Sequence, residues 1–416
     1  MTVKSVLQQS PISPEPSSSG PVALSSEPLT SEHITERAPS HPPHLSIIEP
    51  VNPVNIGMPE MEPDSGVSVS RYEFWPAWFF YTPVVVQSLW HGVKYRNFAL
   101  PLIANPSIAL SGMVGESKND ILALAGSEAK KWISPFVTLT RTDMPESMQL
   151  NDALLAMQEE GIEFPIVAKP DMGCRGVGVQ LLDSEEGVLE YIHTFPRGAR
   201  YLLQEKVPYD AEAGVFYIRY PGEKKGRVTS ITLKYTPFVV GDGTSTLAQL
   251  IENDPRAGQL SHLYFPRHQD KLDWVLTEGC QFRLAFAGSH SRGCIFRNGN
   301  QYITEQLAER LDHIFDDLPG FHFGRLDVKF HDIKSLMKGE KLTILEINGA
   351  SSEAAHIWDR NTPLKEIFST LLVQYRTLYE IGDLQRKAGH KTPSLWALYK
   401  TWRAEKALVE HYPATD

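Results

Sequence analysis

Two stretches of the sequence could present charged and polar side chains together on neighbouring strands. The run RLDVKF (325–330) alternates charged and apolar residues, so in a strand its three charged residues share one face. The run LTILEIN (342–348) places a carboxylate and an amide on one face in the same way. If the two strands pair, three oxygen ligands converge, and Mg²⁺ takes such ligands together with waters and nucleotide phosphates. The sequence therefore predicts a magnesium site at Asp327, Glu346 and Asn348, with a surface ion pair as the alternative for Asp327 alone.

A third stretch, IVAKPDMGCRGVGV (166–179), delivers a lysine at the end of an expected strand and then a glycine-rich turn. Backbone N–H groups of such a turn can close around phosphate oxygens, and Lys169 would add a positive charge. A plain tight hairpin explains the glycines about as well. The GxxxxGK[ST] motif is absent from the sequence, which excludes the common P-loop nucleotide fold.

Short β-type runs alternate with helical patterns from about residue 160, which predicts an α+β or α/β fold. Strands are expected at residues 165–169, 200–207, 215–220, 228–235, 325–330 and 342–348. Apolar residues at helical spacing predict helices over 303–314 and 362–382, and a last amphipathic helix over 394–412. The second helix should begin at Thr362 and Pro363 and end near Gly382.

Composition divides the chain into five parts. Residues 1–70 hold 12 Pro and 14 Ser and no Phe, Tyr or Trp, so they cannot bury enough apolar surface to offset the entropy of ordering. We expect a disordered tail there, with a docking segment for a partner as the alternative. The remaining parts are an aromatic apolar segment (71–96), a short leading domain (97–150), a domain with the motifs above (151–381) and a C-terminal helix (382–416).

The aromatic segment carries no Asp, Glu, Lys or Arg from residue 74 to residue 91. Its length is at the lower edge for a membrane span, and Pro76 and Pro83 would break a spanning helix. Packing on the folded body is the leading interpretation. Peripheral membrane contact through residues 72–90 and a true span are the alternatives.

Charge and cysteine content narrow the classes of function. With 40 Lys and Arg against 50 Asp and Glu, the net charge of −10 does not favour a broad nucleic-acid surface. The three cysteines show neither CxxC nor metal-ligand spacing, so neither a disulfide framework nor a structural zinc site is supported. The first 20 residues contain no apolar run of signal-peptide length, and a cytoplasmic location is expected, with the membrane periphery as the alternative.

The order of these motifs resembles the ATP-grasp superfamily over about residues 115–360. Members such as D-alanine:D-alanine ligase, glutathione synthetase and the amino-terminal ligase part of cyanophycin synthetase hold ATP between two α+β subdomains. They activate a carboxylate as an acyl phosphate, which an amine or another nucleophile then attacks. The resemblance implies an α+β ATP-grasp fold here, with two subdomains clasping ATP behind a short leading domain and a disordered N-terminal tail.

The resemblance also implies roles for individual residues. Those assigned to the nucleotide are Lys118, Lys169, Gly173, Arg175, Gly176, Gly178, Glu205, Lys206, Val207 and Glu212. The lysines and the glycine loop would hold the phosphates, residues 205–207 the adenine, and Glu212 the ribose hydroxyls. Lys234 would lie near the γ phosphate and Arg325 would steady the transferring phosphoryl group, so these two are the expected catalytic residues.

Three departures from the family narrow this expectation. D-alanine:D-alanine ligases carry an HGxxGEDG motif, and the nearest run here, GMVGESK (112–118), lacks its His and its acidic pair, which does not favour a cell-wall role. The usual ExNPxP motif of the family is replaced by EINGASSE (346–353). This run keeps the expected metal ligands Glu346 and Asn348 but differs in the region that shapes the site of the second substrate. The run GDGTSTLAQLI (241–251) resembles cyanophycin-type ligases and favours amino-acid or peptide substrates.

The function expected from the sequence is an ATP- and Mg²⁺-dependent carboxylate-amine ligase. It would work through an acyl phosphate on small-molecule carboxylate and amine substrates and release ADP and phosphate. Two alternatives stay open: a nucleotide-binding scaffold or regulator that does not ligate, and a membrane-peripheral ligase that acts on an envelope carboxylate.

Overall fold

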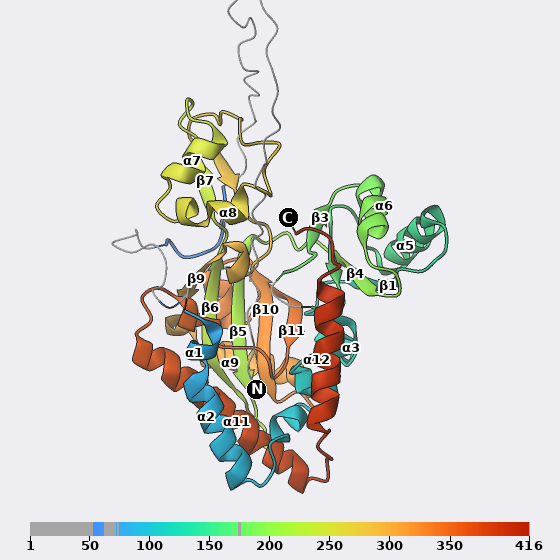
Figure 1. Ribbon diagram of the computed structural model, residues 1–416, viewed down its shortest axis with the longest axis vertical. Coiled ribbons are helices and arrows are strands. Elements are labelled where there is room, and N and C mark those ends of the chain that lie inside the picture. The colour runs from blue at the N-terminus through green and yellow to red at the C-terminus, as the bar shows by residue number, and fades with distance from the viewer. Residues whose placement is uncertain (1–52, 62–71, 73–74, 174–175, 416) are drawn as a thin grey trace, which may run out of the picture. The chain divides into compact units, whose positions relative to one another are not determined.

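Figure 1 shows the computed structural model of the chain, which describes residues 53–61, 72, 75–173 and 176–415. All six expected strands are present, and because their sheets are antiparallel the α+β class is confirmed. Five further strands were not predicted from the sequence, and none of them is longer than 5 residues: β1 (Phe136–Thr140), β3 (Gln180–Leu182), β7 (Phe238–Val240), β8 (Gln281–Arg283) and β9 (Ile295–Asn298). Strands this short contain too few residues for an alternating pattern of apolar and polar side chains to be recognised.

The larger sheet has five antiparallel strands in the order β11 (Leu342–Asn348), β10 (Phe323–Phe330), β5 (Ala211–Ile218), β6 (Arg227–Tyr235) and β9 (Ile295–Asn298). One face packs on α9 (Glu305–Asp316), where Val328 and Leu311 share a core. The other face packs on α11 (Leu364–Lys387), where Phe323 meets Leu378 (Figure 1). Residues 325, 327 and 329 alternate with the core residues of β10, so they lie on the α11 face, beyond the part that α11 covers.

The smaller sheet has the order β1 (Phe136–Thr140), β4 (Arg200–Glu205), β2 (Ile166–Pro170) and β3 (Gln180–Leu182). Two helices, α5 (Glu146–Glu160) and α6 (Glu185–Thr194), pack against it (Figure 1). Met157 of α5 and Val188 of α6 share a core with Ile166 of β2. The two sheets are thus the two α+β units between which the resemblance would place a nucleotide.

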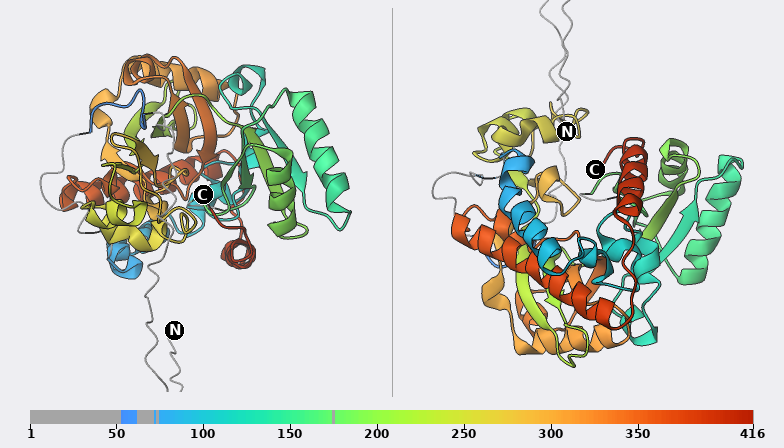
Figure 2. Two further views of the ribbon diagram at one scale, coloured as in Figure 1. Left: turned by 90° about the horizontal axis from the view of Figure 1, so that it is seen from above. Right: turned by 60° about the horizontal axis from the view of Figure 1, so that its bottom comes forward.

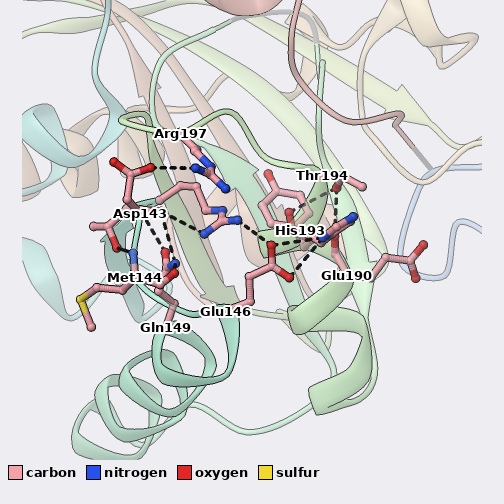
Figure 3. Close-up of polar contacts among 11 residues, drawn as sticks. Asp143, Met144, Glu146, Gln149, Glu190, His193, Thr194 and Arg197 are labelled. Atoms are coloured by element: carbon pink, nitrogen blue, oxygen red, sulfur yellow. Dashed lines mark hydrogen bonds and ion pairs between the residues drawn. The ribbon is translucent and has the colours of Figure 1, made fainter.

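A polar network fixes the turn after β1 to both of these helices (Figure 3). Arg141 is buried and donates to Glu146, at the start of α5, at 2.6 Å. His193, near the end of α6, approaches the same carboxylate at 3.1 Å. Arg197 pairs with Asp143 at 2.9 Å. Since these contacts join α5 to α6 on the sheet, we assign the network a structural role.

A third, smaller lobe lies between β6 and β9 in the sequence. It contains the hairpin of β7 (Phe238–Val240) and β8 (Gln281–Arg283), with α7 (Leu247–Asn253) and α8 (Ser261–Tyr264). The expected turn and helix at 241–251 are present: Asp242 accepts from the backbone N–H groups of Thr244 and Ser245, and Thr246 and Gln249 form a capping box.

Residues 97–150 contribute to four cores, and each of these is shared with residues from other parts of the chain. Leu100 packs on Tyr379 of α11, Ile121 of α3 (Lys118–Leu122) joins the core of the larger sheet, and Val137 joins that of the smaller sheet. The short leading domain predicted over 97–150 therefore has no separate core among the described residues. Short apolar runs spaced along this range find partners in different parts of the fold, which sequence order does not reveal.

Residues 53–61, which the composition assigns to the disordered tail, are ordered. The Asn55 side chain bonds both the N–H and the carbonyl of Thr236, and the hydroxyl of Tyr235 donates to the carbonyl of Pro59 at 3.0 Å. Met58 and Met61 pack on the core of the larger sheet. A few anchors therefore offset the ordering entropy here. The rest of the predicted tail, 1–52 and 62–70, lies outside the described residues.

The aromatic segment packs on the body, as expected, through α1 (Ala77–Phe80) and α2 (Thr82–Lys94), which lie along α11 (Figure 2). Phe80 and Val84 are buried against Ile367 and Leu371 of α11. The opposite side of α2 is apolar and exposed. Within the described residues, no helix has the length and apolar character needed to cross a membrane.

Helix α11 does not end at Gly382 but continues to Lys387. Gly382 is buried in the helix, where an added Cβ would lie 2.2 Å from the carbonyl oxygen of Leu100. A glycine is needed at this position because the backbone of α11 is in close contact with the backbone of Leu100. The expected helix end was therefore wrong, since a contact glycine and a capping glycine look alike in a sequence.

We expect Gly382→Ala to lower the free energy of unfolding by about 2 kcal/mol, although alanine favours a helix by about 1 kcal/mol over glycine. The new Cβ must displace the backbone of Leu100. Gly187 in α6 is the matched control, because its nearest neighbour would lie 3.5 Å from an added Cβ. Urea unfolding should show Gly187→Ala neutral or stabilising; equal stability of the two variants would contradict the close contact.

Candidate active site

A cavity of about 930 Å³ lies where the two sheets and the β7–β8 lobe meet. Eleven of the residues predicted from the sequence line it: Lys169, Gly176, Glu205, Lys206, Val207, Glu212, Lys234, Arg325, Asp327, Glu346 and Asn348. Lys118, Gly173 and Gly178 lie outside this lining, and Arg175 lies outside the described residues. Residues from six strands and the links between them thus converge on one space.

The predicted pairing of the two motif strands is present. Asp327 lies opposite Glu346, and Arg325 lies opposite Asn348. The register shifts between Asp327 and Val328, so Leu345 is left as an extra residue in β11. Because of this bulge, Ile344 and Ile347 both reach the core while Glu346 and Asn348 line the cavity.

Because of the bulge, the backbone carbonyl of Leu345 is available to Lys169, which lies in β2 of the smaller sheet. Lys169 Nζ donates to the carbonyl oxygen of Leu345 at 3.0 Å and to Gln204 Oε1 at 2.8 Å. The bond to Leu345 joins the smaller sheet to the edge of the larger one, whereas the bond to Gln204 lies within the smaller sheet. Burial lowers the pKa of Lys169 to about 8, although Glu346 opposes the shift.

A network of ion pairs covers the cavity face of β5, β6 and β10. Asp327 accepts from Arg325 at 2.8 Å and lies 3.1 Å from Lys234, which also contacts Glu212 at 3.0 Å. Burial alone would raise the pKa of Asp327, but Arg325 and Lys234 lower it to about 2. Burial would likewise lower the pKa of Lys234, but Asp327 and Glu212 raise it. Asp327 and Lys234 are therefore both charged at neutral pH.

Two residues beside the cavity extend this network. Lys118 Nζ donates to the carbonyl oxygen of Gly173 at 2.8 Å and lies 3.4 Å from Glu346. Lys118 therefore lies next to both β11 and the glycine loop. Glu116 was not predicted: burial raises its pKa to about 8, and its carboxylate accepts from the N–H of Gly349. The one feature of the sequence that could have indicated Glu116 is its position two residues before Lys118.

The three predicted metal ligands fit Mg²⁺ in chemistry. Two carboxylates and one amide supply hard oxygen donors on adjacent strands. The side-chain nitrogen of Asn348 is buried without a hydrogen-bond partner among the described residues, so this donor is available to a ligand oxygen, while the amide oxygen is the atom that suits a metal. Within the same residues, no group of three or more His, Cys, Asp or Glu side chains could hold a metal ion. An Mg²⁺ site completed by nucleotide phosphates does not need one.

The expected adenine hinge is the link from β4 to β5. Glu205, Lys206 and Val207 line the cavity, together with the residues that follow to position 210. The backbone of Glu205 is already engaged, since its N–H donates to Pro135 and its carbonyl accepts from Ser134. This residue can therefore offer its side chain to a ligand, but its backbone is committed to the fold.

The glycine loop is held by a segment that the sequence analysis did not connect with it. Gly173, Gly176 and Gly178 have φ values of +128°, +71° and +71°, which other residues rarely adopt. The N–H of Gly178 donates to Thr415 Oγ1 at 2.9 Å, and the same hydroxyl donates to the carbonyl of Gly176 at 3.0 Å. Helix α12 (Leu395–Val409) leads to this contact. No local signal relates residues that are 237 positions apart.

Replacing Thr415 by Ala should free the N–H of Gly178. We expect its amide to exchange with solvent about five- to tenfold faster, because one hydrogen bond contributes about 1 kcal/mol. Hydrogen–deuterium exchange of the peptide containing Gly178 measures this. Thr415→Ser keeps the hydroxyl and is the control; identical exchange in all three proteins would show that the bond does not protect the loop.

Comparison with known proteins found similarity in solved structures alone. No protein-family model matches the chain, and no curated protein matches it. D-alanine–D-alanine ligase from Bacillus anthracis matches over 68% of this chain and 72% of its own, at 12% identity and a TM-score of 0.38. VanG D-Ala:D-Ser ligase from Enterococcus faecalis matches over 65% and 64%, at 13% identity and 0.36.

A bifunctional glutathione synthetase from Pasteurella multocida matches over 62% of this chain, at 14% identity and a TM-score of 0.32. The match spans only 35% of that protein. Two of the three kinds of ligase named for the sequence resemblance, D-alanine:D-alanine ligase and glutathione synthetase, are among these structures. Because every TM-score lies below 0.5, any functional conclusion depends on the residues of the cavity themselves.

Proposed function

We propose that the protein is an ATP- and Mg²⁺-dependent carboxylate-amine ligase. The observation that carries the proposal is the convergence of Lys169, Lys234 and Arg325 on the strand pair that holds Asp327, Glu346 and Asn348. Cationic side chains around a set of oxygen ligands suit a metal–nucleotide complex. A purely structural ion-pair network would not account for the buried side-chain nitrogen of Asn348, which has no acceptor in the part of the chain that the structure describes.

The proposed chemistry needs little covalent participation by the protein. A carboxylate oxygen attacks the γ phosphorus of ATP, ADP leaves, and the resulting acyl phosphate is attacked by an amine, which releases phosphate and a proton. Both reactants of the first step are anions, so fixed cations lower its barrier. Asp327 holds Lys234 and Arg325 in position. The two cations therefore need little reorganisation when negative charge develops in the transition state.

The residues divide the nucleotide between them in this proposal. Lys169 and Lys118 bind phosphate oxygens, with the glycine loop above them, and the 205–207 link binds adenine. Glu212 binds the ribose hydroxyls, and its existing contact with Lys234 fixes its orientation. Asp327, Glu346 and Asn348 would hold Mg²⁺, which when bound neutralises phosphate charge.

The direct test is a mass-spectrometric screen of the purified protein with Mg-ATP and pooled carboxylates and amines. We expect ADP together with a product heavier by one condensation. A matched reaction without the amine pool should slow ADP release, because the acyl phosphate then turns over only by hydrolysis.

The alternative of a nucleotide-binding scaffold predicts a different result in the same screen. It requires ATP binding by calorimetry with no ADP from any pool. That outcome would contradict the ligase and favour the scaffold, whereas a protein that does not bind ATP would contradict both.

A specific observation favours membrane-peripheral action as an extension of the proposal. The outward side of α1 and α2 exposes apolar side chains, among them Trp78 at 75%, Trp90 at 59% and Val93 at 68%. Lys94 lies over the ring of Trp90 at 5.2 Å, which places a cation at the edge of this surface. Tryptophan beside lysine suits the interface of an anionic bilayer.

Co-sedimentation with vesicles tests this extension. We expect the protein to pellet with phosphatidylglycerol-containing vesicles, and a Trp78→Ser/Trp90→Ser variant to remain in the supernatant. Val373→Ser, at an exposed position of α11, is the control. Equal sedimentation of all three proteins would contradict a role for this surface.

A further inference from the structure

One part of the cavity has no use in nucleotide binding as proposed above. Six aromatic side chains line it: Trp75, Phe80, Tyr81, Phe286, Phe296 and Trp358. We call this group the aromatic chamber. It is built from α1, from the loop and strand around β9, and from residues 355–358, which lie far apart in the sequence.

The rings of the aromatic chamber pack against one another and against His290. Phe80 stacks on Trp358 with ring centroids 5.1 Å apart, and the His290 ring lies 5.1 Å from Phe296 and 6.1 Å from Trp358. Phe80 and Phe296 are buried, at 2% and 7% exposure. Burial lowers the pKa of His290 to about 3, so this ring adds no charge to the wall at neutral pH.

The chamber adjoins the residues proposed to act in phosphoryl transfer. Phe296 of β9 lies opposite Lys234 of β6, about 5 Å away as neighbouring strands are. On the other side, the hydroxyl of Tyr81 donates to Glu353 Oε1 at 2.7 Å, and the backbone carbonyl of Glu353 accepts from Arg325 at 3.5 Å. A carboxylate held near Arg325 would therefore have the aromatic wall beside it.

We propose, on the basis of the ligase function above, that the aromatic chamber binds the side group of the acid substrate and that this acid carries an aromatic ring. Its carboxylate lies at Arg325 and its ring lies against Trp358 and Phe296. Burying an aromatic ring against these faces is favourable, whereas a second charged group placed there would lose its hydration without a partner. Small acids such as alanine would leave the wall uncovered.

Binding of model acids to the full chain saturated with Mg-ADP tests the proposal without turnover. Titration calorimetry compares 3-phenylpropionate with propionate, which differ only in the ring. We expect the phenyl compound to bind at least tenfold more tightly, because burial of the ring adds apolar contact.

Two variants locate that difference. Ala77 lines the cavity from the exposed end of α1, so Ala77→Phe should fill the mouth of the chamber and reduce the preference to less than threefold. Val86→Phe, on exposed α2 and outside the cavity lining, is the matched control and should keep the full preference. Trp358→Leu is a second route to the same loss, should Ala77→Phe not fold.

The outcomes separate this inference from the proposed function. Equal affinity for the two acids in a protein that binds ADP overturns the aromatic chamber and leaves the ligase standing. Loss of ADP binding in Ala77→Phe also overturns it, because the chamber would then hold the adenine. A wild-type protein that does not bind ADP overturns the proposed function, and the inference with it.

Discussion

Asp327→Asn should reduce ATP-dependent ADP release by about a thousandfold, or about 4 kcal/mol of transition-state stabilisation. The substitution keeps the shape of the side chain but removes the negative charge from the proposed metal site. It also removes the anion that orients Arg325 and Lys234, both of which contact this carboxylate. Steady-state release of ADP, in the presence of whichever substrates the screen identifies, measures the loss.

Two further variants make this result specific. Asp383→Asn is the matched control, because Asp383 is a buried carboxylate that pairs with Arg386 and Lys387 outside the cavity. It should keep full activity. Glu346→Gln changes the second carboxylate, whose partner is Lys118, and should lose activity to a similar extent.

Folding has to be monitored alongside, since an unpaired buried cation costs several kcal/mol. Circular dichroism and the unfolding midpoint show whether the variants remain folded. Folded Asp327→Asn and Glu346→Gln proteins that release ADP at near wild-type rates would refute the metal assignment.

Lys169→Met should weaken binding of ATP by about tenfold to a hundredfold, because a charge-assisted contact with a phosphate contributes about 1.5–3 kcal/mol. Methionine keeps most of the apolar stem, so the variant mainly removes the ammonium group. Titration calorimetry with ATP measures the change. Lys131→Met is the control, because Lys131 is an exposed lysine paired with Glu128 outside the cavity.

The lowered pKa of Lys169 makes this contact depend on pH in the range where proteins are usually handled. Its pKa falls from 10.5 to about 8 in the free protein because of burial, and a bound phosphate would raise it again. ATP binding should therefore take up a proton above pH 8, and affinity should fall about tenfold from pH 7 to pH 9. Lys169→Met should lose this dependence; a wild-type affinity that is constant over the range would contradict it.

The lowered pKa of Lys169 also makes the free energy of unfolding depend on pH in a direction that can be derived. Between about pH 8 and 10.5 the unfolded chain holds a proton on Lys169 that the folded protein has lost. Stability of the nucleotide-free protein should therefore rise with pH through this window, and the penalty for burying the charged lysine should be fully present below it. Lys169→Met removes this contribution.

The sequence by itself determined the pairs of residues that lie on one strand face. Alternation along β10 and β11 placed Asp327 with Arg325, and Glu346 with Asn348, because side chains of a strand point to opposite faces in turn. The order of lysine, glycine loop and metal strand suggested that these elements share one site, and eleven of the predicted residues do line one cavity. Local periodicity contains the assignment of residues to strand faces, whereas the shared site was implied by the resemblance to ATP-grasp ligases.

Tertiary structure decided which backbone atoms and distant side chains complete the site. The bulge at Leu345 offers a carbonyl to Lys169 from the other sheet, and Thr415 binds the glycine loop. Gly382 marks a contact between backbones, and residues 53–61 are ordered by a few anchors. Each of these depends on the juxtaposition of segments far apart in the chain, and periodicity and composition describe only neighbours in sequence.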